Sequence, residues 1–137
     1  MIRYVETSCF LRHALSEPGA KLDFRVTNDI ATSRLTQIEI HRSVHRACLN
    51  RRIGDDALHE LREDMRTLFA GIRIVEITPQ IAERAGGEFG VVVRSLDAIH
   101  VATAEVLANS GERVELWTHD TRLADAARSR GLDVRGA

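Results

Sequence analysis

The 137-residue sequence is poor in several features whose scarcity narrows what the protein can be. It has only two cysteines, Cys9 and Cys48, and they form no disulfide or metal-binding pattern. No apolar run is long enough to cross a membrane, and there is no secretory signal, repeat or low-complexity segment. We therefore expect a cytoplasmic protein in a reducing environment, without membrane contact.

Neither positive nor negative charge predominates, because the formal net charge is only −1. The molecule as a whole therefore does not attract polyanions, and any such binding must rest on local groups of arginines. Only Lys21 of the 19 basic residues is a lysine. The composition, 44% hydrophobic and 28% charged, is that of a globular protein, and the length suits one domain with its own core.

Short apolar segments alternate with amphipathic segments, which predicts an α/β fold. Parallel strands joined by helices bury both faces of a sheet, so we expect a three-layer sandwich around a central, mainly parallel sheet, with residues 1–137 as a single domain. Strands are expected near residues 1–5, 30–35, 72–77, 114–118 and 132–135. Helices are expected near 8–17, 21–28, 36–53, 55–69, 79–85, 95–109 and 121–129.

The helix that starts near Ser95 is predicted to be buried on almost every side, because most of its residues are small or apolar. Ser95 is suited to be its N-cap. One acid, Asp97, lies in the first turn, where the helix dipole favours a carboxylate. An ionised acid at the start of a buried helix needs a partner, and a metal ion is one possibility. The alternative is that Asp97 only supports the helix terminus.

Three further acids follow predicted strands: Glu6, Glu39 and Asp120. Each has a structural explanation by itself. Glu39 would complete a capping box with Thr36, Asp120 would be an N-cap, and Glu6 would be a solvated acid. However, the carboxyl ends of parallel strands meet at one edge of a sheet, so all four acids are expected in one cleft.

Four crowded carboxylates raise one another's pKa values unless a cation is present. Mg²⁺ or Mn²⁺ is the natural counterion for such an all-oxygen site. One or two such ions would activate water and stabilise the transition state at a nucleic-acid phosphate. Arg94 and Arg122 lie beside the acids and are candidates for RNA contact.

The segments YVETSCFL, TSRLTQIEI, SLDAIHVATA and LWTHDTRLADAARSRGLDV resemble, in order and spacing, the motifs of PIN-domain ribonucleases, above all the VapC toxins of bacterial toxin–antitoxin pairs. The resemblance covers essentially the whole chain. It places the family's catalytic and metal-binding acids on Glu6, Glu39, Asp97 and Asp120, and its supporting hydroxyl residues on Thr7, Ser8 and Thr118.

The resemblance implies Mg²⁺-dependent cleavage of structured tRNA or ribosomal RNA, with Mn²⁺ as a possible substitute. It also implies a homodimer and a cognate VapB-type antitoxin, which together would form a heterotetramer or a larger complex. The products would carry a 5′-phosphate and a 3′-hydroxyl.

One position departs from the family pattern, because Glu6 stands where the family has Asp. The extra methylene moves the carboxylate outward by on the order of an ångström, whereas Mg²⁺ tolerates little deviation from about 2.0–2.1 Å. The alternative function is therefore a catalytically weak PIN-like module that mainly binds antitoxin or RNA. A receiver-like phosphoacceptor is disfavoured, because Lys21 adjoins no acidic motif.

Two other features allow more than one interpretation. His100 lies beside the acids, but without zinc-ligand spacing it is more simply a structural helix residue. The arginine-rich face that contains Arg42, Arg46, Arg51 and Arg52 would either grip phosphates or pair with acids of the following helix. We favour the solvated, structural interpretation for that face.

Overall fold

The computed structural model, which describes residues 1–19 and 22–137, has one five-stranded sheet at its centre. Its strand order is β3-β2-β1-β4-β5, and all four pairings are parallel. The predicted α/β class is therefore confirmed, with a sheet that is parallel throughout. The strands are β1 (Ile2–Val5), β2 (Ile30–Ser33), β3 (Arg73–Val75), β4 (Val114–Trp117) and β5 (Asp133–Arg135).

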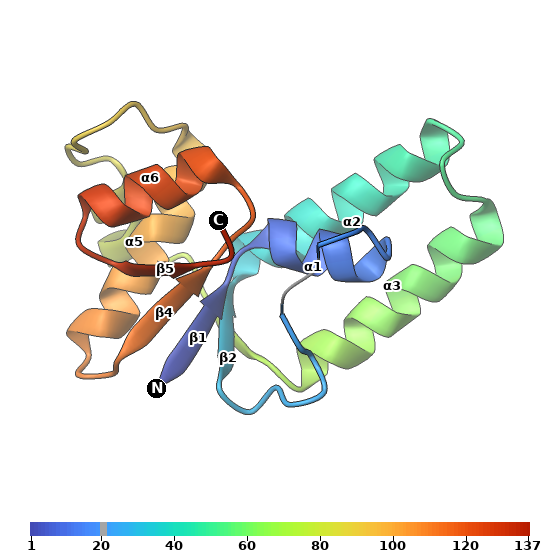
Figure 1. The fold of residues 1–137 in the computed structure, drawn as a ribbon, viewed down its shortest axis with the longest axis horizontal. Coiled ribbons are helices and arrows are strands. Elements are labelled where there is room, and N and C mark those ends of the chain that lie inside the picture. The colour runs from blue at the N-terminus through green and yellow to red at the C-terminus, as the bar shows by residue number, and fades with distance from the viewer. Residues whose placement is uncertain (20–21) are drawn as a thin grey trace.

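Helices cover the sheet, and two of them form a hairpin that extends beyond it (Figure 1). The helices are α1 (Thr7–Ala14), α2 (Arg34–Leu49), α3 (Asp55–Ala70), α4 (Pro79–Ala85), α5 (Ser95–Asn109) and α6 (Thr121–Ser129). The projecting hairpin consists of α2 and α3. Within the described residues, no helix has the length and apolar character that a bilayer span requires.

The core has two parts because successive residues of a strand face opposite sides of the sheet. On β1, Tyr4 packs with Val101 and Leu116 beneath α5 and α6. The next residue, Val5, packs with Phe10 and neighbouring side chains beneath α1, α2 and α3. Strand β1 therefore connects the two helical layers and carries Glu6 directly to the edge between them.

The central helix α5 is buried nearly all round, as predicted, with every residue from His100 to Glu105 buried. Its predicted cap is wrong: Ser95 is the first helical residue, and Arg94 occupies the N-cap position without a side-chain capping bond. The Arg94 side chain bonds Asp97 instead.

Other boundaries were predicted incorrectly. No helix forms over the described residues 22–28, and the predicted start at Lys21 lies outside the described residues. Helix α1 begins at Thr7 with Glu6 as its N-cap, and it ends at residue 14 rather than near 17. Helix α2 begins earlier than predicted because Ser33 accepts a bond from the backbone N–H of residue 35 and caps it.

The loop between α4 and α5 is held in place by Arg130. The guanidinium donates to both carboxylate oxygens of Glu105 at 2.6 and 2.9 Å, and to the carbonyl of Glu88 at 3.0 Å. It also lies 4.2 Å from the centre of the Phe89 ring. These contacts link α6, α5 and the loop, and so restrict the path of the chain toward Arg94.

Candidate active site

The ends of β1 and β4 are joined through the side chain of Glu6. In the parallel register, Val5 lies opposite Trp117, so Glu6 lies beside Thr118. The Glu6 carboxylate accepts hydrogen bonds from the Ser8 backbone N–H at 3.1 Å, the Ser8 hydroxyl at 2.6 Å and the Thr118 hydroxyl at 2.7 Å. It is only 7% exposed, so the alternative of a solvated acid is wrong.

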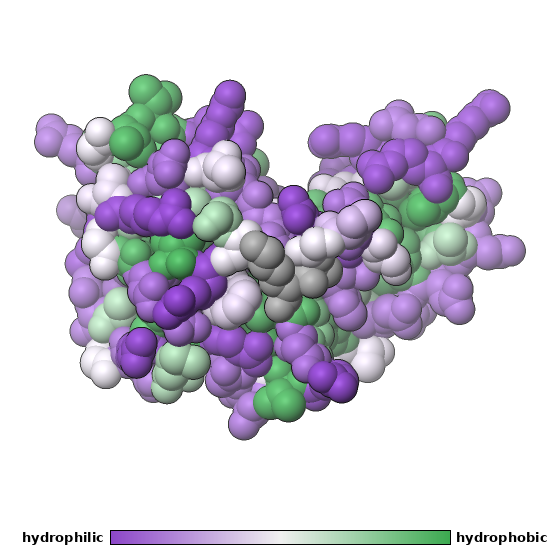
Figure 2. Space-filling view, in the orientation of Figure 1, coloured by the Kyte–Doolittle hydropathy of each residue, from purple (hydrophilic) through white to green (hydrophobic). Residues whose placement is uncertain are grey.

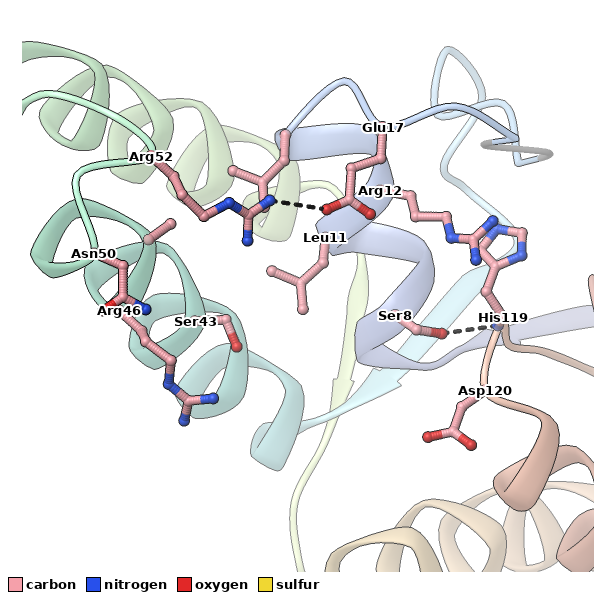
Figure 3. A pocket seen from close by; sticks show the side chains of 12 residues that line it. Ser8, Leu11, Arg12, Glu17, Ser43, Arg46, Asn50, Arg52, His119 and Asp120 are labelled. Atoms are coloured by element: carbon pink, nitrogen blue, oxygen red, sulfur yellow. Dashed lines mark hydrogen bonds and ion pairs between the residues drawn. The ribbon is translucent and has the colours of Figure 1, made fainter.

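The same two hydroxyl groups also fix the chain after β4. The backbone N–H of His119 donates to the Ser8 hydroxyl at 2.8 Å, and that of Asp120 donates to the Thr118 hydroxyl at 3.0 Å. Figure 3 shows Ser8 and His119 facing each other across this junction. Buried Glu6 therefore sets the position of Asp120 through two intermediate hydroxyls.

Asp120 has both a structural contact and a contact with the site. Its Oδ1 accepts from the backbone N–H groups of Arg122 and Leu123 at 2.9 and 3.2 Å, which confirms that it is the N-cap of α6. Its Oδ2 lies 3.6 Å from the Arg94 guanidinium. Oδ1 thus caps α6, while Oδ2 lies near the positive charge of Arg94.

Arg94 connects two of the predicted acids. Its Nε donates to Asp97 at 3.1 Å while its Nη2 lies near Asp120. The hydrogen bond to Asp97, together with the negative charges of Asp97 and Asp120, raises the pKa of Arg94. These two carboxylates, from different elements, therefore share one positive charge.

Glu39 is not part of a capping box, so that prediction is wrong. It lies in the second turn of α2, and the Thr36 hydroxyl is 2.7 Å from that of Thr32. Oε1 of Glu39 instead accepts from the Thr7 hydroxyl at 2.7 Å and contacts Nε2 of His100 at 2.6 Å. Burial raises the pKa of the Glu39 carboxyl, but the interactions with His100 and Thr7 bring it below its ordinary value.

Two cavities meet at α2. One of about 420 Å³ lies between α1, α2 and the β4–α6 junction, with Arg12, Arg52 and Asp120 in its wall (Figure 3). The other, of about 650 Å³, lies between α2 and the start of α5 and contains Glu39 and Asp97. Ser43 and Arg46 line both cavities. Figure 2 shows the surface hollowed between α6 and the α2–α3 hairpin, with mainly hydrophilic borders.

The arginines considered for RNA binding differ in whether they line a cavity. The larger cavity is lined by Arg42, Arg46 and Arg94, whereas Arg122 is exposed and lines neither cavity. Arg52 lies 3.5 Å from Glu17. Within the described residues, no ion pair joins the arginine-rich face to the acids of α3, so the interpretation based on such pairs is wrong.

A divalent cation fits the donor chemistry of these cavities. No group of three or more His, Cys, Asp or Glu side chains among the described residues is gathered closely enough to form a metal site as arranged. However, Asp97 and Asp120 already hold a cationic group, and Oε2 of Glu39 accepts no hydrogen bond from any residue that the structure describes. Carboxylate oxygens of this kind suit Mg²⁺ or Mn²⁺.

Two residues that belong to the surroundings of the site, Tyr4 and Arg12, were not predicted from the sequence. Tyr4 lies beneath the site, with its hydroxyl 2.8 Å from Nδ1 of His100. A tyrosine in a predicted buried strand signals that its hydroxyl needs a partner, so this residue was detectable. The contribution of Arg12 has no such signal, because the cavity that it lines is formed by elements far apart in the sequence.

Residues 3–129 match the family described as PIN domain. Ribonuclease VapC46 of Mycobacterium tuberculosis is 31% identical over 134 residues, which cover 96% of this chain and 94% of that protein.

Two solved structures share the fold. One is a toxin–antitoxin complex from Klebsiella pneumoniae, with a TM-score of 0.67, 20% identity and 93% coverage of both chains. The other is VapBC2 from Rickettsia felis bound to a DNA fragment from their promoter, with a TM-score of 0.67, 14% identity and 98% coverage of both chains.

Thr118→Val tests the link between the strands. It keeps the side-chain shape but removes a donor from the buried Glu6 carboxylate, so we expect a loss of about 1–3 kcal/mol in the free energy of unfolding, measured with urea. The matched control Thr121→Val, at an exposed position, should change it by less than about 0.5 kcal/mol. Equal losses in the two variants would mean that Glu6 does not depend on this hydroxyl.

Proposed function

The chain belongs to the PIN-domain family, and we propose that it is a metal-dependent endoribonuclease of the VapC type that cleaves structured RNA and is neutralised by a cognate VapB-type antitoxin. One observation carries the chemistry of this proposal: Glu39, Asp97 and Asp120 line two adjoining cavities whose walls are rich in arginine. The similarity to VapC46 supports an RNA substrate, and we propose a tRNA or ribosomal RNA.

Glu39, Asp97 and Asp120 are the residues that would hold Mg²⁺ or Mn²⁺. When bound, such an ion would supply positive charge that acidifies water and stabilises the charge developing on the phosphate. Glu6 is the fourth acid of the site, and it would hold an ion there only after giving up its bonds with Ser8 and Thr118. In its observed position it orients Asp120 through those two residues.

In this proposal the basic residues bind the RNA, and the acids act on the water. Arg94 and Arg46 bind phosphates on the two sides of the acids, and the carboxylates orient the attacking water and take up its proton. The water oxygen bonds to phosphorus while the bond to the 3′-oxygen breaks, which leaves a 5′-phosphate and a 3′-hydroxyl.

We further propose a homodimer that joins its antitoxin in a heterotetramer or larger complex. The similarity of the fold to chains from toxin–antitoxin complexes is consistent with such a partner. The alternative of a catalytically weak module that mainly binds antitoxin or RNA is favoured by one observation, the complete engagement of Glu6 by Ser8 and Thr118.

Cleavage of a mixed tRNA pool by the purified, antitoxin-free protein tests the proposed activity. We expect cleavage with Mg²⁺ or Mn²⁺, none with EDTA, and reduction to background by Asp97→Ala. Asp64→Ala, an exposed acid on α3, is the matched control and should cleave normally. Glu6→Asp should raise Mg²⁺-dependent cleavage about tenfold if the longer side chain misplaces the carboxylate.

These variants separate the two candidate functions. Cleavage by Asp97→Ala at the normal rate would show that these acids do not form the catalytic site. Little or no cleavage by the unmodified chain, with tight RNA binding retained and cleavage restored in Glu6→Asp, would instead support the catalytically weak binding module.

Arg94→Gln tests whether this guanidinium and a divalent cation share the same carboxylates. Removing the positive charge should tighten Mn²⁺ binding at least about threefold, because Asp97 and Asp120 lose their ion-pair partner. Electron paramagnetic resonance of free Mn²⁺ measures this affinity without any RNA. Arg113→Gln, at the opposite edge of the sheet, is the charge-matched control. Unchanged or weaker binding by Arg94→Gln would contradict the shared site.

Arg46→Ala tests the proposed path of the RNA. Because Arg46 lines both cavities, its loss should raise KM about fivefold or more and reduce the salt dependence of RNA binding by about one charge, with little change in kcat. Steady-state cleavage at several salt concentrations measures both effects. Arg113→Ala is the control, and an identical salt dependence in the two variants would place the RNA elsewhere.

A further inference from the structure

A chain of hydrogen bonds runs from the core of the sheet to the site. The Tyr4 hydroxyl lies 2.8 Å from Nδ1 of His100, and Nε2 of His100 lies 2.6 Å from Oε1 of Glu39. Tyr4 is 0% exposed and His100 only 1% exposed, whereas Glu39 lies at the wall of the larger cavity. Three elements, β1, α5 and α2, each contribute one member.

The direction of the hydrogen bonds follows from the chemistry of the two ends. A neutral histidine ring carries one hydrogen, so one of its two nitrogens donates and the other accepts. The carboxylate of Glu39 only accepts, so Nε2 carries the ring hydrogen. Nδ1 of the neutral ring is then the acceptor for the Tyr4 hydroxyl, which supports the tautomer of His100 that donates to Glu39.

The bonds leave the two oxygens of Glu39 in different states. Oε1 accepts from both His100 and Thr7, whereas Oε2 accepts from no residue that the structure describes. Two donors on one oxygen, from α5 and α1, fix the rotation of the carboxylate about its last side-chain bond.

We propose that Tyr4 and His100 are positioning residues that orient the Glu39 carboxylate, so that Oε2 is the oxygen offered to a divalent cation. The inference rests on the proposed function for the role of Glu39, although the bonds themselves exist without it. Outer hydrogen-bond partners of metal-binding carboxylates act in this way, and losing one costs about 10- to 100-fold in metal affinity or activity.

A purely structural role makes different predictions. A buried histidine needs partners for both ring nitrogens, and any core acceptor satisfies that need. If His100 only fills the core, its replacement by an apolar residue will alter stability but not metal affinity. If it positions Glu39, a substitution that keeps the donor will preserve metal affinity even where the core packs less well.

The tautomer is tested first, in the protein without added metal. Nitrogen-15 NMR of the His100 side chain should show hydrogen on Nε2 and an acceptor at Nδ1. In Tyr4→Phe, which removes only the hydroxyl, the Nδ1 resonance should lose the shift caused by the hydrogen bond. Hydrogen on Nδ1 in the unmodified chain would overturn the proposed direction, whatever the function of the protein.

Mn²⁺ binding and RNA cleavage are then measured on four variants. His100→Leu should raise the Mn²⁺ dissociation constant about tenfold or more and lower kcat with little change in KM. His100→Gln, which places an amide donor near the Nε2 position, should recover most of this loss. Tyr4→Phe should weaken Mn²⁺ binding by about threefold. Val101→Ala, the neighbouring core residue, controls for stability and should lower Tm without changing Mn²⁺ affinity.

The outcomes separate this inference from the proposed function. If the unmodified chain neither binds Mn²⁺ nor cleaves RNA, the proposed function fails, and the inference fails with it even if the tautomer is correct. If the unmodified chain does both but His100→Leu binds Mn²⁺ as tightly as Val101→Ala, the inference is overturned and the proposed function stands.

Discussion

A carboxylate beside an apolar core is stable only when hydrogen-bond donors or a positive charge surround it, and the carboxyl edge of this sheet is organised by that requirement. Glu6 has Ser8 and Thr118, and Glu39 has Thr7 and His100. These donors come from the end of β4, the first turn of α1 and the second turn of α5, which the parallel topology brings to this edge. Strand pairing and acid burial therefore support each other, since the paired strands bring these donors to the acids.

The fold was largely predictable from local signals. Proline after Thr78 and glycine after residue 85 mark both ends of α4, and Asp120 marks the start of α6. The errors occurred where a polar residue had a choice of partners. Thr36 and Glu39 have the spacing of a capping box, but each finds a partner elsewhere in the fold, and Ser33 becomes the cap.

The candidate site was predictable in its residue types but not in its contacts. Strand ends and helix starts suggested the four acids, but the expectation of one shared cleft is not met: Glu39 and Asp97 line one cavity, Asp120 lines the other, and buried Glu6 lines neither. Their partners come from distant positions: His100 is 61 residues from Glu39, and Thr118 is 112 residues from Glu6. Local patterns carry no information on such pairs. The bridging position of Arg94 likewise depends on the loop that Arg130 fixes.

Helix α2 presents its cavity-lining side chains at a regular interval. Glu39, Arg42, Ser43 and Arg46 follow the spacing i, i+3, i+4 and i+7, which is one stripe of a helix. One helix therefore carries both an acid and the arginines, and it continues into the hairpin that projects beyond the sheet (Figure 1). Any displacement of α2 would therefore move all four of these side chains together.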